Sequence, residues 1–273
     1  MSNPIIIKAN PSWLRFDFSE LIHFRWVFFM LMVRDIKLRY KQTCLGIAWV
    51  IFQPLLTAGI FTLIFARIMH LTGDGIPYVL FAFCGLIPWV VFSGSLQRGS
   101  NSLINDAQLI TKVYFPRIFI PLSAIFGLII DYLISIAMML ALMFFKGVTP
   151  SIHLWFLPIA TLLLFLFASG VNLLLASVNV YYRDFKHIVP FMVQLWMYAS
   201  PIAYSANLIP EKYQALYYLN PLSGIIDIFR WTFLGMGNFP VYSFSVALGA
   251  SLLLFFVGVF FFEKLKRNFA DII

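Results

Sequence analysis

Charged residues are scarce in this sequence. They occupy 11% of its 273 positions, whereas hydrophobic residues make up 62% and the mean hydropathy is +0.90. A soluble domain typically contains about 25% charged residues, which it needs to cover its surface. The scarcity of charge therefore excludes an ordinary soluble globular protein and indicates an integral membrane protein.

Cysteine and histidine are also sparse. The two cysteines, Cys44 and Cys84, are 40 positions apart, and the four histidines are scattered, so neither a disulfide framework nor a zinc-ligand spacing is present. The sequence contains no G-x-x-x-x-G-K-[ST] loop for nucleotide phosphates, no H-E-x-x-H, no G-x-S-x-G and no closely paired carboxylates. The chain alone is therefore predicted to be no enzyme and to bind no metal and no cofactor.

Long uncharged runs dominate instead. Between Lys41 and Arg67 lie 25 residues without a formal charge, and a helix needs roughly 20 residues to cross a ~30 Å hydrocarbon core. Runs of this kind predict an all-α integral membrane protein with six transmembrane helices. Their expected ranges are 47–69, 77–96, 118–145, 154–182, 187–206 and 241–262. The fifth contains Pro190 and Pro201, which predict a bend.

The stretch 207–236 is apolar but interrupted. It contains Glu211, Lys212, Asp227, Arg230 and the helix-breaking pair Asn220-Pro221. A seventh span would place these charges in hydrocarbon, at roughly 2.5–3.5 kcal/mol for each charge near the centre. We therefore expect two short re-entrant helices on the extracytoplasmic side, with their break at Asn220-Pro221.

Basic residues are distributed unevenly along the chain. Of the 19 Lys and Arg, 15 fall before residue 47, in the 97–117 and 183–187 loops or in the tail, and four fall on the opposite side. The positive-inside rule then places both termini in the cytoplasm. The expected parts are a cytoplasmic N-terminus (1–46), a membrane domain (47–262) and a cytoplasmic tail (263–273). The net charge of +8 is thus a signal of topology and anionic lipid, with no nucleic acid as partner.

Residues 24–43 are predicted to form an amphipathic interface helix. Apolar positions at helical spacing lie beside a basic edge. The apolar positions are Phe29, Val33, Ile36 and Tyr40, and the basic edge contains Arg34, Lys37 and Lys41. Two interpretations remain open: the helix is a membrane anchor with snorkelling cations, or Arg34, Arg39 and Lys41 also bind the anionic headgroup of a substrate.

Two further segments carry short-helix signals between spans. In 101–117, Asn105 or Asp106 is placed to cap a short helix that Pro116 ends, and 181–190 is a short, mixed loop. Such segments suit docking into a cleft of another protein, and ordinary connecting loops are the alternative.

Four segments of the chain carry a family resemblance. They are RDIKLRYKQTCLGIAWVIFQPL (34–55), INDAQLITKVYFPR (104–117), NVYYRDFKHIVP (179–190) with SPIAYS (200–205), and LNPLSGIIDIFR (219–230). In this order they resemble the transmembrane subunit of ABC-2 type exporters. The branch is the one that moves polysaccharides and polyol phosphates, including the O-antigen, capsule and teichoic acid exporters. The resemblance extends from about residue 24 to the tail.

The resemblance implies a homodimer in the bacterial cytoplasmic (inner) membrane, paired with two copies of a separate nucleotide-binding subunit. That subunit would bind ATP and Mg²⁺, while this chain passes a lipid-linked polysaccharide through a lateral opening between spans one and five. Segments 101–115 and 183–189 would be coupling helices, and 207–236 the gate helices. The corresponding coupling residues are Asn105, Asp106, Lys112, Tyr114, Arg183, Asp184 and Phe185. The corresponding gate residues are Asn220, Pro221, Asp227 and Arg230.

Aromatic side chains offer weak, sequence-tolerant surfaces for sugars, and they make up 18% of the chain. Candidates for the channel lining are Phe52, Phe61 and Phe65 in span one and Trp196, Tyr198 and Tyr204 in span five. Anchoring at the interface is the alternative role. For Asp131, inside the third span, we expect a hydrogen bond between helices.

Other classes of transporter remain as alternatives. An ABC-2 exporter of drugs or small lipids shares the fold. An ion-coupled transporter needs several polar residues at the midplane and internal repeats, which the sequence lacks. A membrane-bound glycosyltransferase would need acidic metal-binding clusters.

Overall fold

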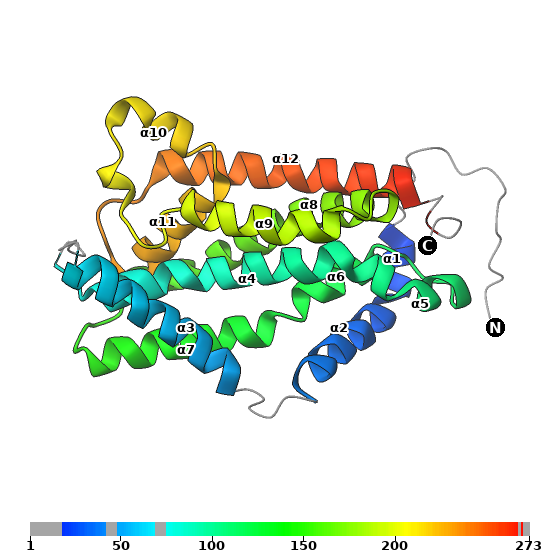
Figure 1. The fold of residues 1–273 in the computed structure, drawn as a ribbon, viewed down its shortest axis with the longest axis horizontal. Coiled ribbons are helices and arrows are strands. Elements are labelled where there is room, and N and C mark those ends of the chain that lie inside the picture. Colours follow the sequence, from blue (N-terminus) through cyan, green and yellow to red (C-terminus); the bar gives the residue numbers. More distant parts are fainter. Residues whose placement is uncertain (1–17, 42–47, 69–74, 267–268, 270–273) are drawn as a thin grey trace.

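The computed structural model describes residues 18–41, 48–68, 75–266 and 269. Every regular element in this part of the chain is a helix, and the long helices run along the long axis of the molecule (Figure 1). The α-helices are α1 (Phe18–His23), α2 (Arg25–Tyr40), α3 (Ala48–Phe61), α4 (Tyr78–Asn105), α5 (Ala107–Lys112), α6 (Phe119–Phe126), α7 (Ile129–Phe145), α8 (Leu157–Tyr181), α9 (Phe185–Tyr198), α10 (Glu211–Tyr217), α11 (Pro221–Leu234) and α12 (Val241–Leu265). A π-helix, η1 (Thr62–Ile68), continues α3, and the 3-10 helices η2 (Ile152–Phe156) and η3 (Ala206–Leu208) complete the set.

The core of the protein lies around α4, which is 83% buried over its most apolar stretch. This helix contacts α8, α6 and α11. Phe92 on α4 stacks on Phe167 of α8 with ring centroids 4.9 Å apart, and both side chains are fully buried. An apolar helix of this length would span a bilayer, yet protein side chains enclose most of it. α4 is therefore the central helix of the bundle.

Small residues bring α8 and α12 into backbone contact. A Cβ added to Gly170 would lie 2.5 Å from the backbone nitrogen of Phe255, and one added to Gly258 would lie 2.5 Å from the carbonyl oxygen of Gly170. Helices in membranes associate through such close packing, because lipid provides little hydrophobic driving force between them. The two glycines therefore fix the separation of α8 and α12.

Five stretches of the described chain are long and apolar enough to cross a membrane. They are Ala48–Ile68, Tyr78–Asn105, Phe119–Phe145, Ile152–Tyr181 and Val241–Leu265. The sixth predicted span, 187–206, corresponds to α9, which has 14 residues and ends at Tyr198, before Pro201. The multi-pass character is confirmed by these helices, and the count of six remains a prediction.

Two predicted boundaries differ from the structure. The second span was expected to end at residue 96, but α4 continues to Asn105, so 101–105 belong to it and only α5 is a separate short helix. The third is interrupted at Gly127 and Leu128, between α6 and α7. Both parts pack on α4, but α6 also packs on α2 and α8, whereas α7 also packs on α3.

The stretch 207–236 forms two short helices, α10 and α11, on either side of Asn220 as the breaker pair predicted. The Asn220 side chain caps α11 by accepting a hydrogen bond from the Leu222 backbone nitrogen at 3.2 Å. α11 is almost entirely buried and packs against α12 and α4. Its re-entrant placement in a bilayer remains a prediction.

Candidate functional site

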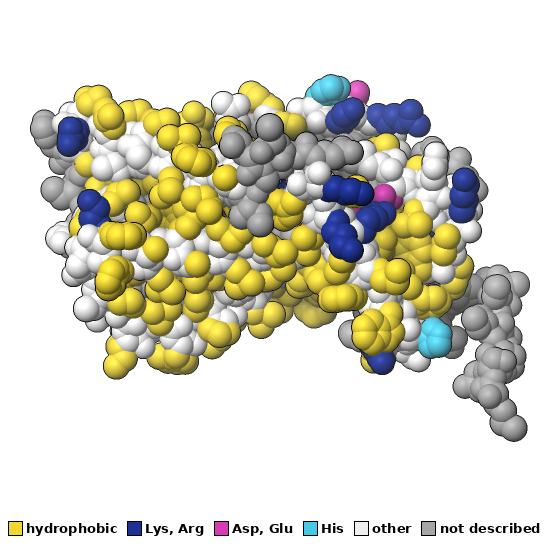
Figure 2. Space-filling view, turned by 90° about the horizontal axis from the view of Figure 1, so that it is seen from below, with side chains coloured by type: hydrophobic (Ala, Val, Ile, Leu, Met, Phe, Trp, Pro, Cys, Tyr) yellow, Lys and Arg dark blue, Asp and Glu magenta, His cyan; other side chains and the backbone are white. Residues whose placement is uncertain are grey.

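Charged side chains gather toward one end of the molecule, and the rest of the visible surface is largely hydrophobic (Figure 2). At that end a second hydrophobic cluster joins α2, α4, α5, α8 and α12 through Leu31, Leu103, Ile110, Val180 and Phe262. The turn that precedes α9, with Arg183 and Asp184 exposed, follows directly from the end of α8. The predicted interface helix and both predicted coupling segments therefore lie together at this end of the molecule.

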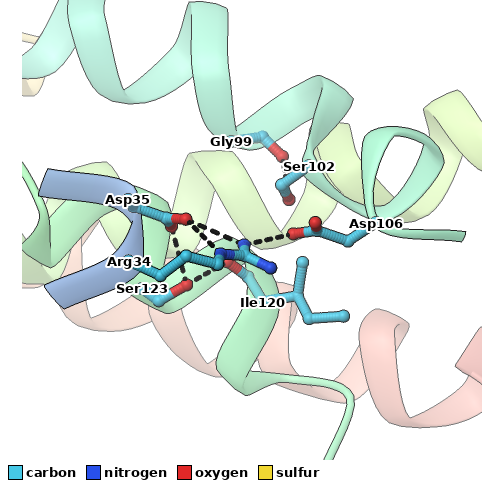
Figure 3. Close-up of polar contacts among 7 residues, drawn as sticks. All are labelled: Arg34, Asp35, Gly99, Ser102, Asp106, Ile120 and Ser123. Atoms are coloured by element: carbon cyan, nitrogen blue, oxygen red, sulfur yellow. Dashed lines mark hydrogen bonds and ion pairs between the residues drawn. The ribbon is translucent and has the colours of Figure 1, made fainter. Parts of the chain in front are cut away.

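Arg34 joins α2 to α5 through two carboxylates (Figure 3). Its Nη2 lies 2.8 Å from Asp35 Oδ1 and 2.6 Å from Asp106 Oδ2. Asp35 Oδ2 also accepts a hydrogen bond from Ser123 Oγ of α6 at 3.1 Å. Burial lowers the pKa of the Arg34 guanidinium, but the hydrogen bonds to Asp106 and Asp35 outweigh it and leave the pKa above its ordinary value. The result is a charged bridge across three helices.

Asp106 precedes α5 at the N-cap position, as the sequence indicated, but its side chain makes no capping hydrogen bond. The carboxylate reaches Arg34 instead. The short helix α5 is thus tied to α2 through the residue that begins it, and Lys112 lies at its other end. Tyr114, beyond α5, donates a hydrogen bond to Glu20 Oε1 of α1 at 2.9 Å.

A second link joins the C-terminal end of α2 to α7. Arg39 forms an ion pair with Asp131, and the Tyr40 hydroxyl donates a hydrogen bond to the same carboxylate. Burial raises the pKa of the Tyr40 hydroxyl and the bond to Asp131 adds to that effect, so Tyr40 remains a donor. The expected hydrogen bond between helices is present at Asp131, together with a cation that sequence reasoning did not pair with it.

Arg98 is the residue that sequence reasoning missed. It lies on α4 and lines two cavities, of about 430 Å³ and 480 Å³, that Arg39 also lines. The count of charges by loop did not single it out, because 97–117 was counted as one connecting segment although α4 continues to Asn105. One signal was available: Arg98 is the only Lys or Arg between Arg67 and Lys112.

The predicted lining aromatics separate into an exposed and a partly buried group. Phe52 and Tyr198 are exposed. The other four are partly buried. Of these, Trp196 packs edge-on against Phe92, and its indole nitrogen donates to Asn220 Oδ1 at 2.9 Å. Phe61 and Phe65 pack near Tyr78 and Phe81, and Tyr204 donates a hydrogen bond to the Tyr198 carbonyl. The structure does not bring the six onto one surface of the single chain.

Two of the predicted gate residues, Asp227 and Arg230, form a network at the opposite end. Arg230 is only 4% exposed, and its Nη2 donates to the Ile202 carbonyl at 3.0 Å while its guanidinium lies 3.6 Å from the centroid of the Phe81 ring. Asp227 accepts a hydrogen bond from the Tyr218 hydroxyl at 2.8 Å, and its other oxygen lies 3.9 Å from Arg230 Nη1. This network fastens α11 to the chain after α9 beside a cavity of about 550 Å³.

Metal-binding side chains do not cluster in the part of the chain that the structure describes: no three His, Cys, Asp or Glu residues lie together as ligands. The acidic residues near α2 are instead paired with arginines. The polar end therefore offers ion-paired contacts between helices and two open cavities.

Comparison with known proteins identifies the family. The sequence profile of the ABC-2 type transporter matches residues 27–234. An O-antigen export system permease protein RfbA of Klebsiella pneumoniae is 35% identical over 243 residues, which are 88% of this chain and 92% of that protein. An RfbA protein of Myxococcus xanthus is 29% identical over 92% of this chain and 97% of its own length. The polysialic acid transport protein KpsM of Escherichia coli is 24% identical over 73% of this chain and 78% of its own. The chain therefore belongs to the ABC-2 type transporter family.

Proposed function

We propose that this chain is the membrane-spanning subunit of an ATP-driven exporter that moves a lipid-linked polysaccharide, such as O-antigen or a similar surface glycan, across the cytoplasmic membrane. The observation that carries the proposal is its similarity, over most of its length, to permeases named for O-antigen export and polysialic acid transport. The all-helical bundle with five long apolar helices supports a transport role.

The chain acts as a homodimer with two copies of a nucleotide-binding subunit, which supplies the sites for ATP and Mg²⁺. The absence of a phosphate-binding loop from the sequence supports an ATPase on a separate subunit. The surface of α3 and η1 supports a second copy, because this stretch is only 11% buried and carries a row of exposed large side chains. These include Trp49, Phe52, Leu56, Ile60 and Leu63.

Both termini lie in the cytoplasm, and α9 is the fifth of six spans. With 14 residues, α9 is about 21 Å long at ~1.5 Å per residue, and the chain to Ser205 completes the crossing. The paired helices α10 and α11 then return on the extracytoplasmic side as gate helices. The basic end of the molecule, seen in Figure 2, supports this orientation.

The conformational change of the nucleotide-binding subunit is transmitted to this chain through α5 and residues 183–189. Arg34 supports this role for α5, since its bridge to Asp106 transmits a displacement of α5 to α2. Arg39 then passes it to α7 through Asp131. Arg34 and Arg39 are paired with carboxylates, so they attract an anionic headgroup from a distance through the positive charge of α2. Lys41 is exposed at the end of α2 and contacts the headgroup directly. Normal transport by an Arg39→Gln/Lys41→Gln variant at normal protein level would contradict the headgroup role.

Depletion of the chain in its native host tests the export function. We expect lipid-linked glycan to accumulate on the cytoplasmic face while the surface glycan disappears. Unchanged surface glycan with accumulation of small amphiphiles inside the cell would replace the proposal with an exporter of drugs or small lipids.

A further inference from the structure

Arg98 differs from its neighbours because no carboxylate of the described residues contacts it directly, although the charges of Asp131 and Asp35 act on it from a greater distance. Arg34 is paired with Asp35 and Asp106, and Arg39 with Asp131. Arg98 forms no ion pair or hydrogen bond with any residue of the described ranges, although it lies on a helix long enough to span the membrane. The Arg98 side chain is exposed, so its guanidinium is open to an anion that is not part of this chain.

Both cavities beside Arg98 have one guanidinium in excess. The cavity of about 430 Å³ is lined by three arginines and two aspartates, and that of about 480 Å³ by two arginines and one aspartate. Arg98 and Arg39 line both, and the carboxylate in the larger cavity, Asp131, is already paired with Arg39. The unmatched charge is therefore that of Arg98, and it favours an anion with oxygens for a planar guanidinium to hold, such as a phosphate.

The larger cavity continues from Arg98 between two facing helical stripes. Trp49, Gln53 and Thr57 follow one face of α3 at a spacing of four residues. Trp89, Ser93 and Gln97 follow one face of α4 with the same spacing, and Met197 of α9 adds part of the wall. Each stripe thus presents an indole, an amide and a hydroxyl to the same space.

These stripes suit a sugar better than they suit a lipid tail. Indole faces take the C–H surface of a pyranose ring, and side-chain amides pair with its hydroxyls. The amides of Gln53 and Gln97 have no hydrogen-bond partner within the described chain, and both residues are exposed. Exposed amides without partners on two apolar helices suit a polar ligand such as a sugar better than a lipid tail.

We propose that Arg98 and the facing stripes of α3 and α4 form a binding site for a glycosyl phosphate: Arg98 holds the phosphate, and the exposed Trp49 together with Gln53 and Gln97 holds the first sugar. The site lies between α3 and α4, with Met197 of α9 at its edge. The inference rests on the proposed export function and names the substrate group that this function would have to recognise. An ordinary phospholipid can offer its phosphate to Arg98, but it has no sugar for the side chains of α3 and α4 to bind.

Binding to the full-length chain in nanodiscs of neutral lipid tests the site. The probes are a polyprenyl diphosphate carrying one sugar, the same polyprenyl diphosphate without sugar, and phosphatidylglycerol. We expect Arg98→Gln to weaken both polyprenyl probes by about tenfold or more, and Arg98→Lys to weaken them less. Gln53→Leu and Gln97→Leu should weaken only the probe that carries the sugar.

Lys37→Gln is the matched control, since Lys37 is an exposed cation at the same end that lines neither cavity. It should bind all probes as the unmodified chain does. Wild-type affinity in Arg98→Gln, or phosphatidylglycerol competing as well as the sugar-bearing probe with no effect of the glutamine variants, would overturn the proposal.

Export assays in the host separate this inference from the function on which it rests. If depletion abolishes the surface glycan but Arg98→Gln at normal protein level exports fully, the site is wrong and the export function stands. If depletion leaves the surface glycan unchanged, the export function itself is wrong. Arg98→Lys, which keeps the charge, guards against a loss that reflects only poor folding of Arg98→Gln.

Discussion

At the scale of single residues, α2 is fastened by two arginines that lie five positions apart. Arg34 reaches carboxylates on α2 and beside α5, and Arg39 reaches a buried carboxylate on α7. Both arginines were candidates from the sequence for binding an anionic headgroup. Their partners could not be predicted, because Asp106 is 72 positions from Arg34 and Asp131 is 92 positions from Arg39. Only the tertiary packing of the helices from α4 through α7 brings these carboxylates to α2.

Arg34→Gln is expected to reduce export while leaving membrane insertion intact, because it removes the bridge that connects α5 with α2. Surface glycan and protein level, measured together, check the result. The charge-swapped variant Arg34→Asp/Asp106→Arg should recover part of the lost export, whereas each single swap should not. Failure of the double swap to exceed both single swaps would contradict a direct role for this pair.

Asp131→Asn is expected to destabilise the protein, because Asp131 is 2% exposed and its neutralisation leaves Arg39 without a counter-ion. Breaking a fully buried pair costs about 3–5 kcal/mol, and the effect here should be smaller because Arg39 is 20% exposed. The unfolding midpoint in detergent checks this expectation. Tyr40→Phe removes one hydrogen bond and should lower the midpoint less; an equal or larger fall would indicate that the ion pair contributes little.

At the scale of elements, gaps between charges predicted most helices, because the bilayer makes long uncharged runs necessary. The predicted helix boundaries were wrong where a helix is surrounded by protein instead of lipid. α4 runs on to Asn105 because polar side chains such as Ser100 and Ser102 are buried inside the bundle, with Ser102 bonded to the Gly99 carbonyl. The interruption at Gly127 has no charge signal, and it separates a part that packs on α2 from a part that packs on α3.

The α8–α12 contact gives a matched pair of glycine variants. Gly170→Ala is expected to destabilise by roughly 1–3 kcal/mol, because its new Cβ would meet the backbone of Phe255 at 2.5 Å. Gly249→Ala is the control, since nothing lies within 4 Å of a Cβ there and alanine favours the helix. Thermal unfolding in detergent should separate the two. Equal midpoints would show that the helices can move apart without cost.

At the scale of the whole molecule, six spans with both termini in the cytoplasm predict a specific pattern of cysteine labelling. In a Cys44→Ser/Cys84→Ala background, single cysteines at Lys146 and Lys212 are expected to react with an impermeant maleimide in intact spheroplasts. Cysteines at Lys112 and Arg183 should react only after permeabilisation. This alternation follows if α9 crosses the membrane, because Arg183 and Lys212 flank it.

Labelling of the Lys212 position only after permeabilisation would contradict a crossing by α9 and leave five spans. The same labelling tests the orientation of the termini, since a reversed molecule would exchange the two patterns. Neither property follows from the helices alone, because the apolar surface of each helix fits a bilayer in both directions.

Transport by the purified complex tests glycan export without any other component of the cell. The chain and its ATPase partner are reconstituted into liposomes that contain the lipid-linked glycan of the host, and protection of the glycan from an added endoglycosidase is followed over time. The account predicts that ATP increases the protected glycan in liposomes with outward-facing ATPase subunits, and that liposomes lacking this chain show no increase. Steady ATP hydrolysis without any change in protected glycan, accompanied by movement of a small amphiphile, would contradict it.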